Sequence, residues 1–252
     1  MPAPVVLSRH AWGDPRAPRR ALLVHGLGSN GPLMWRYGVA LADAGWIAEA
    51  VDLRGHGVAP RALDYTLAAY AADLAATAPD GGGTWDLVIA HSLGGAASVL
   101  VAAADSSWTR RLVLIDPAIH LTPRDRDIVR ESQERSFADP TAAAVLAEHP
   151  TWHEQDIELK ALSARQASRW AVEQTSAQNQ DWDVRDAASA LSVPTHVIAS
   201  DPKVYSIFRG KPAESVLADN SRITMSVVAG AGHSPHRDKP EATIEELMRA
   251  VT

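Results

Sequence analysis

The chain has 252 residues, of which 46% are apolar and 21% charged, enough length and apolar content for one fully packed domain. Its formal net charge of −6 disfavours nucleic acid and anionic membrane as partners, because both are polyanions that bind basic surfaces. The chain has no cysteine, which excludes disulfides, cysteine-ligated zinc and a thiol nucleophile.

Short apolar runs alternate with longer, alanine-rich amphipathic segments along most of the chain. The runs predict seven strands, at Val5–Ala11, Ala21–His25, Ile47–Leu53, Asp86–His91, Arg111–Asp116, Thr195–Ser200 and Ile223–Val228. The segments predict helices at Leu33–Ala44, Leu67–Ala76, Leu93–Ala104, Ala213–Ala218 and Glu241–Val251. This alternation is typical of an α/β fold, a mostly parallel central sheet with helices on both faces.

The alternation is interrupted between Pro117 and Pro194, where the sequence indicates several helices and no strand. Asp139–Ala147 is one such helix, and another is expected near Thr151, whose spacing to Glu154 is that of a capping box. We therefore expect a helical cap at residues 118–190, inserted between core segments 1–117 and 191–252. The insert contains three of the eight tryptophans, namely Trp152, Trp170 and Trp182.

The sequence AHSLGG at residues 90–95 lies between a predicted strand and a predicted helix, the setting that a nucleophile elbow requires. Small residues on both sides of Ser92, Ala90 and Gly94, let the strand and the helix approach closely. A helix N-terminus behind Ser92 offers backbone N–H groups to a developing oxyanion. Ser92 is therefore predicted to be a nucleophile, although a buried turn serine is the plainer interpretation of this short pattern.

The sequence HGLG at residues 25–28 directly follows another predicted strand. A turn there can present a backbone N–H toward the same oxyanion, so the N–H groups of Leu27 and Leu93 are the expected donors. Phosphate binding is less favoured, because no Lys-Ser or Lys-Thr pair follows as in a P-loop.

Four motifs occur in one order along nearly the whole chain: HGLG at 25–28, DLRGHG at 52–57, AHSLGG at 90–95 and GAGHS at 230–234. Together they resemble the successive signatures of the α/β-hydrolase fold superfamily. The resemblance implies esterase-like chemistry by a serine, a histidine and an acid, without indicating a particular substrate. The chain departs from the family pattern at its start, where only one strand precedes Ala21–His25.

The expected base is His233, which follows the last strand in a glycine-rich loop and matches the family order of nucleophile, acid and base. Asp116 and Asp201 each end a predicted strand and compete for the role of the acid. Asp201 occupies the position that is more usual in the family, after the strand that follows the cap, so it is the predicted acid and Asp116 the alternative.

A serine nucleophile favours attack on a carbonyl, so the predicted activity is hydrolysis of a carboxylic ester or lactone through an acyl-enzyme. The tryptophans favour a substrate with an apolar or aromatic part, in a pocket formed by residues drawn from His25, Gly26, Trp35, His91, Trp152 and Trp170. The alternatives are carbon–carbon bond hydrolysis of a β-diketone-like substrate and a non-catalytic small-molecule receptor.

No metal or organic cofactor is expected. His149 and His153 are four residues apart, but Pro150 interrupts a helix joining them and no third ligand has matching spacing. The first residues show no basic region followed by a long apolar run, which favours a cytoplasmic location and no membrane partner. The expected partner is a small-molecule substrate, and the sequence does not indicate an oligomeric state.

Overall fold

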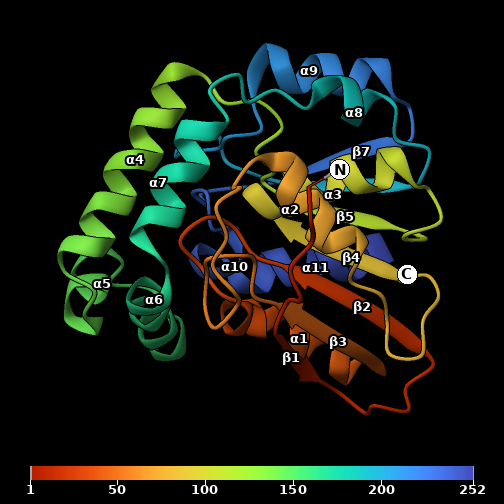
Figure 1. Ribbon diagram of the computed structural model, residues 1–252, viewed down its shortest axis with the longest axis horizontal. Helices are drawn as coiled ribbons and strands as arrows, with labels where there is room; N and C mark the ends of the chain where they lie inside the picture. Colours follow the sequence, from red (N-terminus) through yellow and green to blue (C-terminus); the bar gives the residue numbers. More distant parts are fainter. Residues whose placement is uncertain (1, 252) are drawn as a thin grey trace.

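A seven-stranded sheet forms the centre of the computed structural model, which describes residues 2–251 (Figure 1). The strands are β1 (Arg9–Trp12), β2 (Arg19–Val24), β3 (Trp46–Val51), β4 (Leu87–His91), β5 (Leu112–Ile115), β6 (Thr195–Ser200) and β7 (Ile223–Val228). Their order is β1-β3-β2-β4-β5-β6-β7; β1 is antiparallel to β3, and every other neighbouring pair is parallel. The predicted, mostly parallel sheet is confirmed.

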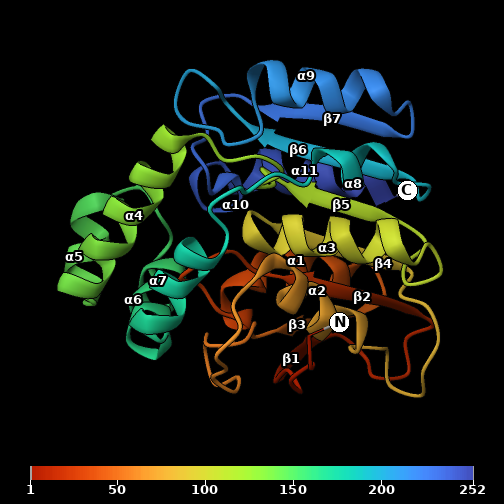
Figure 2. The same cartoon turned by 45° about the horizontal axis from the view of Figure 1, so that its top comes forward.

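Helices cover both faces of this sheet (Figure 2). Those around the sheet are η1 (Gly31–Met34), α1 (Trp35–Asp43), α2 (Leu67–Ala75), α3 (Leu93–Ala104), α8 (Arg185–Ser189), α9 (Gly210–Asp219), α10 (Pro235–Asp238) and α11 (Pro240–Val251). Alternate residues of β2 belong to two separate apolar clusters, Leu22 to the one that includes α2 and α3, and Leu23 to the one that includes α1 and α11. Both faces of the strand are therefore buried, which explains why the run is continuously apolar.

The first strand is shorter than predicted. We expected Val5–Ala11, whereas β1 covers only Arg9–Trp12. Val6 is 88% exposed, and the N–H of Val5 donates to the Asp73 carboxylate at 2.7 Å and not to a neighbouring strand. The sequence pattern predicted a longer strand because an apolar run does not reveal that the backbone at Val5 bonds to a side chain.

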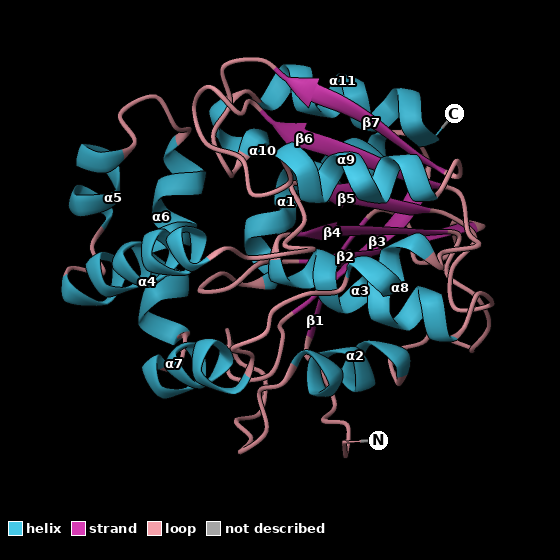
Figure 3. Cartoon of the chain, turned by 90° about the horizontal axis from the view of Figure 1, so that it is seen from above, coloured by secondary structure: helices cyan, strands magenta, loops and turns pink. Residues whose placement is uncertain are grey.

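Four helices between β5 and β6 lie together to one side of the sheet (Figure 3). They are α4 (Pro123–Ala138), α5 (Ala142–Glu148), α6 (Glu154–Gln166) and α7 (Arg169–Gln178). The fifth helix of this interval, α8, instead packs against α3 and α9. The group that stands apart from the sheet therefore ends before Arg185; we call α4–α7 the cap helices.

The capping box in this region lies elsewhere than predicted. His153, not Thr151, caps α6, its ring nitrogen accepting from the N–H of Gln155. A true capping box starts α4, where Thr122 and Asp125 bond each other's backbone N–H. Among residues 2–251, no helix is long and apolar enough to span a membrane.

Candidate active site

Ser92 lies at the sharp turn between β4 and α3, with φ +52° and ψ −116°. A non-glycine residue rarely adopts a positive φ, so the surrounding packing must stabilise this strained turn. A Cβ atom at Gly94 would lie 2.5 Å from the backbone oxygen of His25, which shows why the helix needs glycine there. The predicted strand–turn–helix geometry around Ser92 is therefore present.

Ser92, His233 and Asp116 form a hydrogen-bonded chain at the carboxyl edge of the sheet. His233 Nε2 lies 2.9 Å from Ser92 Oγ, and His233 Nδ1 lies 2.6 Å from Asp116 Oδ2. Asp116 is fully buried, whereas Ser92 retains 8% exposure. The imidazole thus connects a hydroxyl that a ligand can reach with a carboxylate that is closed off from solvent.

The loop after β6 surrounds the Asp116 carboxylate with donors. The Ser206 hydroxyl donates to Oδ1, the N–H of Ile207 donates to Oδ2 at 3.0 Å and the N–H of Phe208 donates to Oδ1 at 3.3 Å. Burial opposes the charged form, but His233 and these donors hold the pKa of Asp116 below its usual value. The carboxylate therefore remains charged beside the imidazole.

Asp201, the predicted acid, does not contact His233. Its carboxylate instead accepts from the N–H of Gly230 at 2.8 Å and the N–H of Lys203 at 2.9 Å. It therefore fixes the loop that carries His233, one strand farther from the nucleophile than Asp116. Both aspartates end parallel strands at the same edge, and which one faces the imidazole depends on the path of the loops, which the sequence pattern does not specify.

Two buried histidines hold the loop that contains Leu27. His25 Nε2 accepts from the N–H of Leu53 at 3.0 Å, and His56 Nε2 accepts from the N–H of Gly28 at 3.1 Å. Burial lowers the pKa of His25 to about 4 and that of His56 to about 3, so both rings are neutral acceptors. The loop is thereby fixed beside Ser92 and the start of α3.

Two spaces meet at Ser92. The larger, which we call the chamber, has a volume of about 520 Å³ and is lined by His233, Gly26, His91 and Trp152, among others. The smaller, the slot, has a volume of about 30 Å³, and its walls include Leu93, Leu121, Trp182 and Ile207. Leu27 borders both spaces.

The structure places only part of the predicted pocket at these two spaces. Gly26, His91 and Trp152 line the chamber, whereas His25, Trp35 and Trp170 line neither space. Trp35 donates its indole N–H to Asp156 of α6 at 2.8 Å, and Trp170 is 44% exposed with its ring against Tyr65. The prediction that Trp35 and Trp170 line the pocket is therefore wrong, because both side chains contact other parts of the protein instead.

Other residues at the site were not found from the sequence. They are the slot residues Leu121, Trp182 and Ile207, the Asp116 partner Ser206, and the chamber cations Lys160 and Arg237. Trp182 was recognised only as part of the cap, and none of these residues belongs to a motif. These residues could be recognised only once the helices and loops that carry them were placed in space.

The chain belongs to the alpha/beta hydrolase family, whose model matches residues 21–246. It is 34% identical over 153 residues to the lipase LipV of Mycobacterium tuberculosis, a match that covers 60% of this chain and 57% of the lipase. The chain therefore spans less than two thirds of that relative. It is 28% identical over 214 residues to the esterase YbfF of Escherichia coli, covering 79% of this chain and 80% of the esterase.

Solved structures share the fold over nearly the full length. An N-formylmaleamic acid deformylase from Pseudomonas putida has a TM-score of 0.80 at 24% identity, with 96% of each chain covered. An esterase from Exiguobacterium antarcticum has a TM-score of 0.78 at 17% identity, covering 97% of this chain and 95% of that one. At these identities the likeness concerns the fold alone.

Proposed function

We propose that this protein is a serine hydrolase that cleaves a carboxylic ester through an acyl-enzyme, with Ser92 as nucleophile, His233 as base and Asp116 as acid. The observation that carries this proposal is the chain of two short contacts, 2.9 Å from Ser92 Oγ to His233 Nε2 and 2.6 Å from His233 Nδ1 to Asp116 Oδ2. The family and its lipase and esterase relatives support hydrolysis of an ester.

In the first half of the reaction, Ser92 Oγ attacks the ester carbonyl carbon while His233 Nε2 takes the hydroxyl proton. The charged Asp116 keeps the other proton on Nδ1 and stabilises the imidazolium as it forms. The tetrahedral oxyanion accepts from the N–H groups of Leu27 and Leu93. Leu93 is the first residue of α3, so its N–H has no carbonyl partner within the helix.

The tetrahedral intermediate collapses when the bond to the leaving oxygen breaks and His233 gives its proton to that oxygen. Water then attacks the acyl-enzyme, with His233 again accepting a proton, and the acid product leaves as Ser92 recovers its hydroxyl hydrogen. Burial holds the pKa of His91 well below its usual value, so this neighbouring imidazole stays neutral and does not compete as a proton acceptor.

A lactone can follow the same path with its leaving oxygen tethered to the acyl group. Carbon–carbon bond hydrolysis of a β-diketone-like substrate is the alternative for the same three residues, and a non-catalytic receptor is the alternative outside enzyme chemistry. Parallel assays of a nitrophenyl ester, a lactone and a β-diketone would separate the three reactions, and we expect the ester or lactone to react fastest.

Pre-steady-state kinetics with 4-nitrophenyl acetate tests the acyl-enzyme. We expect a burst of one equivalent of nitrophenolate or a rate limited by acylation, and in either case a loss of about 10³-fold or more in Ser92→Ala. Ser98→Ala is the matched control, since Ser98 is a fully buried serine on the same helix. Equal turnover by the wild type and Ser92→Ala would contradict the proposal.

A further inference from the structure

Two cationic side chains that line the chamber, Lys160 and Arg237, are removed from water and have no carboxylate partner. Lys239 also lines the chamber, but it is exposed to solvent. Lys160 of α6 donates to the backbone oxygen of Gly28 at 3.0 Å. Arg237 of α10 is 5% exposed, its Nη1 donates to Ser234 Oγ at 3.3 Å and its Nε is buried without a partner. Within residues 2–251, no carboxylate oxygen lies within 4.0 Å of a side-chain nitrogen of Lys160 or Arg237.

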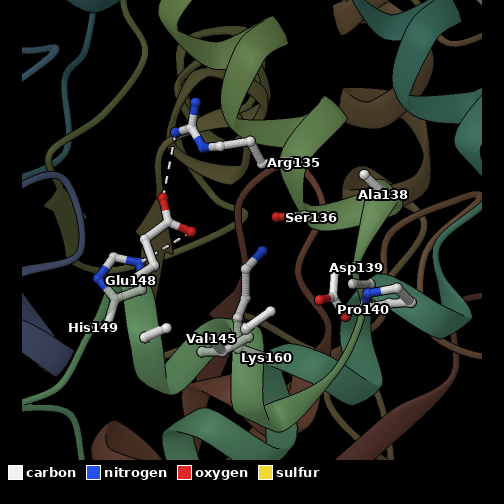
Figure 4. A pocket seen from close by; sticks show the side chains of 12 residues that line it. Arg135, Ser136, Ala138, Asp139, Pro140, Val145, Glu148, His149 and Lys160 are labelled. Carbon is white, nitrogen blue, oxygen red and sulfur yellow. Dashed lines mark hydrogen bonds and ion pairs between the residues drawn. The ribbon is translucent and has the colours of Figure 1, made fainter.

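The carboxylates that attract these cations already have other partners. Asp156, which acts on Arg237, pairs with Arg36 at 2.7 Å and accepts from the Trp35 indole N–H at 2.8 Å. Glu148 of α5 pairs with Arg135 of α4 at 3.3 Å, and both lie beside Lys160 (Figure 4). Asp238 accepts from the indole N–H of Trp152 at 2.7 Å and the N–H of Gly232 at 2.8 Å. The attraction between these carboxylates and the two cations is therefore long-range, without hydrogen bonds between them.

The charged and titratable groups around Lys160 are Arg135 of α4, Glu148 at the end of α5, His149 directly after it, and Arg237 of α10. Asp139, directly after α4, lines an adjoining cavity together with Lys160 (Figure 4). Burial and, less strongly, repulsion from Arg237 lower the pKa of Lys160 to about 8, against attraction by Glu148. A cation removed from water without an anion is unfavourable. An anionic ligand in the chamber would relieve this cost for both side chains.

The position of His233 indicates which part of an ester occupies each space. His233 lines the chamber but not the slot. Because His233 must give its proton to the leaving oxygen, the leaving group lies on the chamber side. The acyl group then extends into the slot, whose small volume and mostly apolar walls, including Leu121 and Trp182, suit a short chain. The polar residues Arg126, Ser176 and Asn179 also border the slot, and the Nε of Arg126 is buried without a partner.

We propose that the substrate is an ester of a short apolar acid whose leaving group carries an anion, and that Lys160 and Arg237 bind this anion. The proposal rests on the proposed function and specifies its substrate class. A carboxylate and a phosphate share the required chemistry, because each accepts charge-assisted hydrogen bonds from an ammonium and a guanidinium group.

The test compares 4-acetoxybenzoate with its neutral methyl ester, methyl 4-acetoxybenzoate, in the wild type, Lys160→Met and Arg237→Met. The quantity is the ratio of kcat/KM for the anionic ester to that for the neutral one, and comparing this ratio between proteins removes the intrinsic reactivity of each ester. We expect each substitution to lower the ratio about tenfold or more, since a hydrogen bond to a charged group is lost. Lys211→Met, on the exposed surface of α9, is the matched control and should leave the ratio unchanged.

An unchanged ratio in both chamber variants would overturn the proposal. An equal loss for both esters would also overturn it, because this result assigns Lys160 and Arg237 a structural role through Gly28 and Ser234. If the wild type hydrolyses neither ester and Ser92 resists an active-site phosphonate, the proposed function fails instead.

Product inhibition of the wild type gives a second readout that does not depend on the folding of a variant. We expect 4-hydroxybenzoate to inhibit hydrolysis of the neutral ester at a concentration about tenfold or more below that of methyl 4-hydroxybenzoate. Phenyl phosphate inhibiting better than 4-hydroxybenzoate would assign the site to a phosphate, whereas stronger inhibition by the neutral compound than by both anions would contradict it.

Discussion

Replacing Asp116 by asparagine changes one group at the centre of the proposed mechanism. In the native protein, Oδ2 of Asp116 accepts from His233 Nδ1 at 2.6 Å and from the N–H of Ile207 at 3.0 Å. An asparagine amide has only one acceptor oxygen, and Oδ1 of Asp116 faces more donors than Oδ2 does. The amide NH₂ should therefore replace Oδ2 and point toward His233.

His233 must then accept at Nδ1, which places its proton on Nε2, the atom that should act as the base. We expect kcat to fall about 10³- to 10⁴-fold, equivalent to about 4–5.5 kcal/mol of lost transition-state stabilisation. The orphaned N–H of Ile207 should cost a further ~1–3 kcal/mol of folding stability. Stopped-flow and steady-state assays on one nitrophenyl ester measure the first effect, and thermal unfolding by circular dichroism measures the second.

Asp201→Asn is the control for this prediction. Asp201 accepts only from backbone N–H groups, those of Gly230 and Lys203, and an asparagine oxygen can retain one of these bonds. We expect kcat to change less than about tenfold. A larger loss of kcat in Asp201→Asn than in Asp116→Asn would refute the reasoning, provided that both variants unfold cooperatively.

Other parts of the structure support predictions about the anion preference, the acyl preference and the stability of the fold. The preference for an anionic leaving group should be fully present well below pH 8, partly lost at pH 8 and weaker still above it, because the pKa of Lys160 is about 8 and only its protonated form attracts an anion. In Lys160→Arg the kcat/KM ratio should stay level to higher pH, and a level wild-type ratio from pH 7 to 10 would contradict this prediction. Leu121→Ala should enlarge the slot and raise kcat/KM for a 4-nitrophenyl butanoate relative to the acetate, whereas an unchanged acyl preference would show that the acyl group lies elsewhere. Arg54→Met should leave the buried Asp73 without its two contacts of 2.6 Å, cost about 3–5 kcal/mol and lower Tm by roughly 10 °C, while a shift below 3 °C would contradict the importance of this pair.

The sheet could be predicted from the sequence because its strands are buried on both faces. Runs such as residues 87–90 are continuously apolar, and their alternate residues belong to the apolar clusters on opposite faces of the sheet. The helix α4 was not predicted, because its sequence is rich in charged residues and only Asp125 is buried. A helix that buries so little of its surface lacks the regular spacing of apolar residues from which a helix is predicted.

The position of Ser92 and His233 could be predicted because both lie in local motifs of small residues that the turns require. Which aspartate faces His233 could not be chosen in this way, because Asp116 is bound beside it by Ser206 and Ile207, which are 90 and 91 residues away in the chain. Lys160 could not be recognised at all, since an isolated lysine in an amphipathic helix usually lies in solvent. Long-range contacts, not local patterns, determine which of these residues lie at the site.

Covalent labelling of Ser92 by a fluorophosphonate tests the central claim most directly. A phosphonylated serine adds the probe mass to a single peptide, so mass spectrometry can place the label at Ser92. We expect rapid labelling of the wild type, none in Ser92→Ala, and labelling slowed by about 10³-fold in Asp116→Asn, because the same base activates the hydroxyl. Equal labelling of the wild type and Ser92→Ala, or a label on any other serine, would contradict the assignment of Ser92 as the nucleophile.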